Sequence, residues 1–448
     1  MASASTALAR HGLVANFATR LRQLDSNGPH WVRELRRRGR ARFEALGLPG
    51  PGLEEWRGTS VAPIAGTEFV PAASAADPLD LAGLPEVAQL DLGGPRLIFI
   101  DGRFCAGPSR GVERPGLWIG GLAAALAAIP ERLQPHLAEQ DPGHLPAFAA
   151  LNSAFLDDGA ALVVGAGVDA GAPVQLVFAT TGGARPIAVH LRTLVAVGPG
   201  ARLRVVETHV GAGQGAYLTN GVTQIFAGDG AQLDHCRVQL DGPLAFHLGN
   251  VRARQMRDSR CVLRAIDLGG RLVRNDVVAT LDGEGAECRL DGLYLTSGEQ
   301  HVDNHTVLEH AQPRGSSREL YKGILSGRSR SVFNGRIVVR ANAQQTDAKQ
   351  SNPNLVLSRG ALAQTRPQLE ILANDVRCTH GATIGRLDEE AVFYLRSRGL
   401  GAWEARQLIL AGFAGEVLDR LELPALRAAL ERAVAARLPG VGGGDVPA

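Results

Sequence analysis

The sequence predicts a mainly β protein, a parallel β-helix with helical segments at both ends of the chain. Short segments of strand character, such as the alternating Arg202–Val205, follow one another from about residue 95. A glycine-rich turn and the strand after it recur: Val197–Leu203 returns thirty positions later as Ala227–Leu233, and Gly283–Ala286 is a third copy. No helical pattern separates these strands, whereas βαβ units need a helix between parallel strands. Stacked coils fit all three observations, and a β-sandwich of nearly three hundred residues would be unusually long.

Composition limits the classes of function. The 448 residues are 45% hydrophobic and can bury a large core. Lys and Arg number 47 against 45 Asp and Glu, a net charge of +2, which argues against nucleic acid as the principal partner. The only lysines, Lys322 and Lys349, lie outside any Gly-Lys-Ser/Thr motif, so this chain is not a P-loop ATPase and is expected to bind no nucleotide.

Targeting signals and cysteine spacing point to the cytoplasm. The residues from Met1 to Ser5 lack the basic start of a signal peptide, and Leu117–Ile129 is too short to span a bilayer. We therefore expect a soluble cytoplasmic protein with no membrane partner. The five cysteines are odd in number and widely spaced, and no CxxC occurs, which favours neither a disulfide framework nor a closed zinc site.

Four segments are predicted along the chain. Residues 1–70 form an N-terminal helical domain, and 71–155 a linker and mixed covering segment. Residues 156–385 form the β-helix core, with first strands from about 95, and 386–448 form a C-terminal helical domain.

The N-terminal domain is expected to contain two helices, at Ala7–Leu24 and His30–Leu46, the second ending at the Gly/Pro-rich run that starts at Gly47. Six arginines fall within residues 33–42. We interpret this run as a solvated helix face paired with nearby glutamates, in preference to a contact with an acidic partner or with nucleic acid.

The C-terminal domain is expected to contain three helices. Asp388–Glu390 places negative charge at the start of the first helix, which ends at Gly399. The second begins near Ala402, and Pro424 starts the third. An apolar stripe is predicted on the second helix at Ala405, Leu408, Ile409, Phe413, Val417, Leu418 and Leu421. These helices either cover the open end of the solenoid or carry a partner interface.

Cys378 and His380 are the leading candidates for chemistry. Because side chains alternate along a strand, both lie on one face with their Cβ atoms roughly 7 Å apart. A thiolate and an imidazole so placed suit a soft metal, but a stable site needs further ligands from another chain or from a sulfide-bearing cluster. The alternative is a structural cysteine beside a hydrogen-bonded histidine. A thiol–imidazole nucleophile is less favoured, because Asp375 would point to the opposite face.

A second cluster contains His301, Asp303 and His305, which would share one face of a strand. Two nitrogens and a carboxylate suit a non-haem metal, but a polar ladder between coils is the preferred interpretation. His235 and Cys236 are adjacent and face opposite ways. The cysteines interpreted as small core residues are Cys105, Cys261 and Cys288.

A series of motifs between Gln300 and Ala411 resembles the SufD subunit of the SUF iron–sulfur cluster assembly system, in the SufB/SufD family. The N-terminal stretch from Gly47 to Arg57 is similar to the same family, less tightly. The motifs are Gln300–Thr306, Glu319–Gly323, Arg330–Gly335, Gln345–Ala348, Asn352–Leu355, Pro367–Ile371, Asp375–Gly385 and Phe393–Gly399.

The resemblance implies a right-handed parallel β-helix that pairs with SufB, while the C-terminal domain binds the ATPase SufC. It implies that His380, with Cys378 as the lesser candidate, helps to hold iron or a transient iron–sulfur cluster at the SufB interface. Pairing of two copies is expected when the chain is isolated. The chain would be a non-ATPase scaffold subunit and no enzyme by itself. The alternatives are a SufB-like paralogue, an inert structural scaffold and, less favoured, a β-helix carbohydrate-active enzyme.

Overall fold

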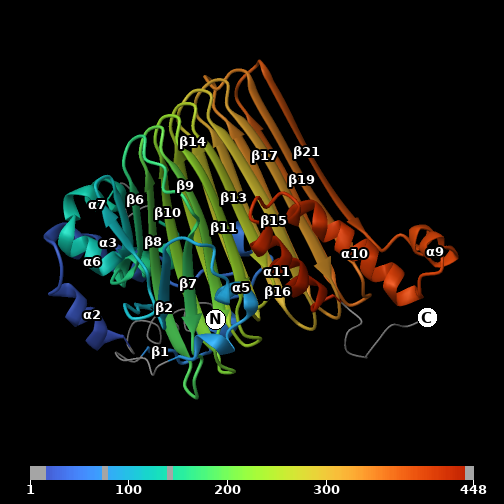
Figure 1. Ribbon diagram of the computed structural model, residues 1–448, viewed down its shortest axis with the longest axis horizontal. Helices are drawn as coiled ribbons and strands as arrows, with labels where there is room; N and C mark the ends of the chain where they lie inside the picture. The colour runs from blue at the N-terminus through green and yellow to red at the C-terminus, as the bar shows by residue number, and fades with distance from the viewer. Residues whose placement is uncertain (1–16, 73–78, 139–144, 439–448) are drawn as a thin grey trace.

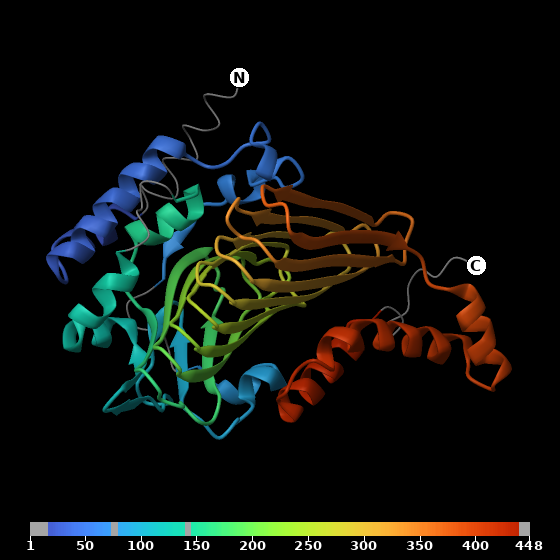
Figure 2. The ribbon, with the colours of Figure 1, turned by 90° about the horizontal axis from the view of Figure 1, so that it is seen from above.

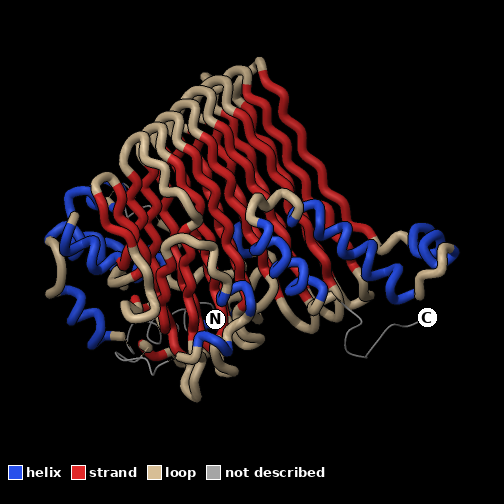
Figure 3. The backbone as a smooth tube through the Cα atoms, viewed as in Figure 1, coloured by secondary structure: helices blue, strands red, loops and turns tan. Residues whose placement is uncertain are grey.

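The computed structural model describes residues 17–72, 79–138 and 145–438. A β-solenoid of about eight turns occupies the middle of the chain, with helices from both ends of the sequence packed around it (Figure 1). Figure 3 shows the strands as one continuous stack, with no helix between successive coils. The predicted fold class, a parallel β-helix between helical segments, is confirmed.

Successive strands of the solenoid alternate between two sheets, here called sheet A and sheet B, so that each coil contributes one strand to each sheet. From β8 and β7 onward every pairing is parallel, and strands of consecutive coils stack in register. Sheet A contains β1 (Val70–Pro71), β4 (Val112–Arg114), β5 (Leu117–Gly121), β6 (Gly159–Val164), β8 (Ile187–Val197), β10 (Tyr217–Ala227), β12 (Phe246–Gln255), β14 (Leu272–Leu281), β16 (His301–His310), β18 (Arg330–Val339) and β20 (Leu362–Ile371). Sheet B contains β2 (Arg96–Ile100), β3 (Arg103–Phe104), β7 (Val174–Thr180), β9 (Arg202–Gly211), β11 (Gln232–Leu240), β13 (Arg260–Asp267), β15 (Glu287–Thr296), β17 (Ser316–Leu325), β19 (Thr346–Val356) and β21 (Val376–Gly385).

The repeated glycine turn sets the register of the coils. The two copies stack on each other, since Leu203 of β9 pairs with Leu233 of β11. The second glycine of each copy adopts a positive φ, +64° at Gly200, +65° at Gly230 and +71° at Gly285, which a side chain would disfavour. A thirty-residue repeat in the sequence therefore corresponds to one turn of the solenoid.

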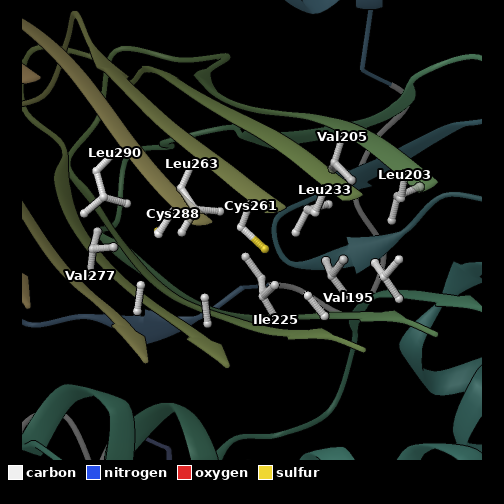
Figure 4. Packing of buried hydrophobic residues seen from close by; sticks show 14 of the residues in the cluster. Val195, Leu203, Val205, Ile225, Leu233, Cys261, Leu263, Val277, Cys288 and Leu290 are labelled. Atoms are coloured by element: carbon white, nitrogen blue, oxygen red, sulfur yellow. The ribbon is translucent and has the colours of Figure 1, made fainter. Parts of the chain in front are cut away.

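The core lies between the inward faces of the two sheets (Figure 4). Cys261 and Cys288 are register partners in this core, and burial raises the pKa of the Cys261 thiol to about 12. Both are therefore unreactive core residues, as predicted. Cys105 differs, because it is only partly buried and packs against the outer side of sheet B.

The N-terminal helices cover the outer face of sheet A. Helix α3 spans the predicted His30–Leu46 and ends at Gly47 with a φ of +65°. Residues 7–16 of the other predicted helix lie outside the described residues, and α2 covers Ala18–Asp25. The other elements of this cover are η1 (Glu54–Trp56), α4 (Ala62–Ala65), α6 (Leu122–Ala128), α7 (Pro130–Leu137) and α8 (Ala147–Ala154).

The interpretation of the arginine run as a solvated face is wrong for Arg36. Its guanidinium is buried and donates hydrogen bonds to the carbonyl oxygens of Leu24, Asn27 and Leu156. It therefore satisfies backbone acceptors where α2 ends. Arg37 does lie in solvent, paired with a glutamate one turn away.

Two short elements of the covering segment, η2 (Leu81–Gly83) and α5 (Glu86–Gln89), pack against the outer face of sheet B. Residues 73–78 of the predicted linker are not among those described. The apolar stretch Leu117–Ile129 begins with strand β5 and continues into helix α6.

The C-terminal helices are α9 (Glu389–Ser397), α10 (Ala402–Leu418) and α11 (Pro424–Ala435). Helices α10 and α11 lie along the outer face of sheet B, and α9 projects away from the solenoid (Figure 2). They do not cover its open end, contrary to one of the two expectations. The predicted stripe is partly wrong: Leu408 is exposed, whereas Leu410 and Ala414 are buried against the sheet. No described helix is long and apolar enough to cross a lipid bilayer.

Candidate functional site

The last coil of the solenoid leaves two strand edges open. Strand β20 ends sheet A and pairs only with β18, and β21 ends sheet B and pairs only with β19, within the part of the chain that the structure describes. Figure 1 shows β21 at the rim of the stack. Unpaired backbone donors and acceptors on such edges are ready to bind another strand.

Apolar side chains accompany these edges. Leu362, Leu372 and Ile384 belong to the last coil or its turn, and their side chains are exposed by 46%, 56% and 52%. Single exposed leucines are ordinary, but three around an open sheet end form a surface suited to a partner.

Cys378 and His380 lie on β21, at this open end. Cys378 is the register partner of Ala348, a core residue, and packs partly against the core, which places the pair on the inward face of the sheet. Partial burial raises the pKa of the Cys378 thiol, so the isolated chain holds it as a thiol near neutral pH. His380 is exposed at the end of the solenoid. Their neighbour Thr379 points to the opposite face.

Two residues behind His380 were missed by the sequence reasoning. Gln350 is the register partner of His380, and its Nε2 donates a 2.7 Å hydrogen bond to Oε2 of Glu319. Glu319 is buried, and burial raises the pKa of its carboxyl to about 7 despite the bond from Gln350. The three positions are 31 and 30 residues apart, so the coil length was the signal that would have found them.

The second predicted cluster lies on one face of β16, as expected, but that face points outward beneath the N-terminal segment. Asp303 accepts hydrogen bonds from Thr59 and from Nη1 of Arg274, and lies 3.0 Å from Nε2 of His305. The Thr59 hydroxyl is 2.8 Å from Nε2 of His301. Although burial opposes it, the charge of Arg274 lowers the pKa of Asp303 to about 2. The cluster therefore fastens the N-terminal segment to the solenoid.

Within the described ranges, no group of three His, Cys, Asp or Glu side chains is arranged to hold a metal ion. At the open end Cys378 and His380 are two side chains, which is fewer than a metal-binding group of three. His235 and Cys236 do face opposite ways: His235 lies 3.0 Å from Glu207 inside the solenoid, and Cys236 is buried on the outer side of sheet B.

A second exposed surface lies on α9 and the first half of α10. Phe393 and Tyr394 of α9 are exposed by 71% and 57%, and Trp403 and Leu408 of α10 by 50% and 54%. We call these four residues the α9–α10 apolar patch. The rest of α10 buries its apolar residues against sheet B, so the patch is the part of this helix pair that is free to bind a partner.

Two family models match nearly the whole chain. Residues 9–176 match the SufBD protein N-terminal region, and residues 178–413 match the SufBD core domain of SUF system FeS cluster assembly. The chain belongs to the SufBD family. The matched SufBD core includes the open end with Cys378 and His380, and also the α9–α10 apolar patch.

Two SufBD relatives resemble the chain over most of their length. An iron–sulfur cluster assembly SufBD family protein of Synechocystis is 34% identical over 407 residues, 88% of each chain. The iron–sulfur cluster assembly protein SufD of Escherichia coli is 30% identical over 396 residues, which are 88% of this chain and 90% of that one.

Proposed function

We propose that this chain is a SufD-like scaffold subunit for iron–sulfur cluster assembly, which pairs with SufB at its open end and docks SufC on its C-terminal helices. The observation that carries the proposal is the position of His380 and Cys378 on an edge strand that has no neighbour on its outer side within the described chain. Side chains there are available to a second protein. Membership of the SufBD family supports the process in which the chain acts.

The pairing proposal rests on the two open strand edges. A second solenoid that adds its own terminal strands would satisfy the free backbone groups and cover Leu372 and Ile384. The double variant Leu372→Asp, Ile384→Arg should abolish co-purification with SufB. Leu244→Asp is the control, because Leu244 is 47% exposed in a turn far along the sequence from that end. Retained co-purification of the double variant would refute pairing at this surface.

The site proposal assigns iron or a nascent cluster to His380, with Cys378 as the lesser ligand and the remaining ligands from SufB. Two donors hold iron weakly, so the cargo is released to a recipient once it is complete. Partner binding would also have to lower the pKa of the Cys378 thiol, since only the thiolate is a ligand.

The test of this site is the iron and sulfide content of the complex assembled anaerobically with SufB and SufC. His380→Ala should reduce cluster content strongly while the subunits stay together. Thr379→Ala alters the opposite face of the same strand and should leave the content unchanged. Normal content in the His380→Ala complex would leave an inert scaffold as the better description.

The docking proposal places SufC on the α9–α10 apolar patch. Deleting residues 386–448 is a poor test, because it would also expose the sheet B residues that α10 buries. The double variant Phe393→Ala, Trp403→Ala removes exposed side chains only and should abolish SufC binding. SufB binding by that variant is the internal control. Unchanged SufC binding would show that SufC docks on a different surface of the chain.

A further inference from the structure

Three side chains form a line on the inward face of sheet B that leads to the open end. Glu319 of β17 is the register partner of Gln350 of β19, and Gln350 is the register partner of His380 of β21. Side chains of register partners lie on the same face, one coil apart, at about 4.8 Å. His380 is thus the exposed end of a line whose other two members are buried.

The inner hydrogen bond fixes the orientation of the Gln350 amide. Its Nε2 donates to Glu319, and both residues are only 3% exposed. The amide is a planar fork, so the oxygen branch points away from the Glu319 side when the nitrogen branch faces it.

The outer half of the same amide is unpaired. In the described part of the chain, Oε1 of Gln350 is buried and has no hydrogen-bond partner. Burying an acceptor without a donor is costly, and such atoms are rare in folded proteins. The line itself offers a donor to that oxygen, the imidazole N–H of His380 on the next coil.

The opposite sheet leaves room for this amide. A Cβ atom at Gly335 of β18 would lie 2.2 Å from Nε2 of Gln350, so the glycine allows the amide to occupy its place. Packing against Gly335 and the bond to Glu319 together hold Gln350 in one orientation.

We propose that Gln350 is a positioning residue for His380: in the assembled complex the His380 ring turns so that its N–H donates to the unpaired Oε1 of Gln350, and the other ring nitrogen, with its lone pair, faces the open end. The inference rests on the proposed function, because it matters only if His380 binds iron. A neutral imidazole has one N–H and one lone pair, and the hydrogen bond made by the first decides which nitrogen is free to bind a metal. Glu319 acts through Gln350 by holding the amide in place.

The experiment measures ferrous iron binding, under anaerobic conditions, to the complex of the full chain with SufB and SufC. Gln350→Met keeps the length of the side chain and removes the acceptor. We expect it to weaken iron binding by roughly tenfold to a hundredfold, as loss of a hydrogen-bonding partner of a metal ligand generally does. The matched variant exchanges the pair, Glu319→Gln with Gln350→Glu. It restores an acceptor beside His380 and should recover most of the affinity.

Two further measurements separate this role from a structural one. The melting temperature and the co-purification of SufB report folding and assembly, and a rescue by the exchanged pair is not expected of a residue that only fills space. His380→Ala tests the proposed function itself. If His380→Ala weakens iron binding and Gln350→Met does not, the inference about Gln350 is wrong while the site stands. If neither variant weakens iron binding, the inference about Gln350 and the proposed role of His380 are both wrong. A loss in Gln350→Met that the exchanged pair does not recover would also overturn the positioning role.

Discussion

Lys322 of β17 forms an ion pair with Glu416 of α10, and its Nζ lies 3.9 Å from the centre of the Phe413 ring. This contact joins the C-terminal helices to the solenoid. The two partners differ in burial: the side chain of Lys322 is 5% exposed and that of Glu416 53%.

The burial difference predicts unequal costs for removing either partner. Glu416→Gln leaves a buried ammonium without its counter-ion and should lower the free energy of unfolding by about 2 kcal/mol. Lys322→Met leaves a carboxylate that water can reach, and should cost about 1 kcal/mol. Urea denaturation measures both, and hydrogen exchange in α10 locates the effect. Equal costs, or a larger cost for Lys322→Met, would contradict the prediction.

The Glu319 carboxyl predicts a pH dependence of stability. Its pKa rises from 4.5 in the unfolded chain to about 7 in the fold, so the folded protein keeps a proton that the unfolded chain releases. The contribution of this bound proton to the free energy of unfolding is fully present below about pH 4.5. It is lost as the pH rises through 7, a loss of about 3 kcal/mol. Glu319→Gln should therefore flatten the fall in stability between pH 5 and pH 8, as measured by urea denaturation. An unchanged slope would mean that Glu319 is ionised in the fold.

Replacing a turn glycine by alanine is predicted to lower stability through the backbone conformation alone. Gly230 has a φ of +65°, and a Cβ atom there would meet no other atom within 4 Å. Gly230→Ala should lower stability by about 1–2 kcal/mol, the cost of a left-handed conformation for alanine. Gly221 in strand β10 is the control, since it also has free space but no positive φ. Thermal melting of the two variants compares them directly, and equal melting temperatures would contradict the account of the turn.

The buried guanidinium of Arg36 predicts a local effect on the N-terminal helices. Arg36→Met leaves the buried carbonyl oxygens of Leu24 and Leu156 without their donor and should cost about 2–3 kcal/mol. Arg37→Met, one residue along and exposed, should be almost neutral. Limited proteolysis between α2 and α3 reads out the difference. Equal resistance of the two variants would show that the Arg36 hydrogen bonds add little.

Much of the fold was predictable because it depends on patterns that repeat. The thirty-residue echo predicted the coil length, and the stacking of Leu203 on Leu233 follows it. Side-chain alternation placed Cys378 on the same face as His380. Burial of Arg36 was not predictable, because it depends on the carbonyl group of Leu156, which is 120 residues away in the sequence.

The helical periodicity of α10 was recognised, and Ala405, Val417 and Leu418 of the predicted stripe are buried, but Leu408 is exposed. Leu408 and Leu410 are both apolar, and only the position of sheet B decides which one is buried. In the same way, the metal-like spacing of His301, Asp303 and His305 gave no sign of Thr59 and Arg274, which fill the cluster with hydrogen bonds.

The most direct test of the central claim is whether a nitrogen of this chain binds the cluster. The chain is labelled with ¹⁵N-histidine, assembled with unlabelled SufB and SufC, loaded with iron and sulfide, and reduced for pulsed electron paramagnetic resonance. We predict a ¹⁵N coupling to the cluster that persists in His30→Ala, a variant of an exposed histidine on α3, and disappears in His380→Ala. A cluster without any ¹⁵N coupling, or with a coupling that survives in His380→Ala, would contradict the account.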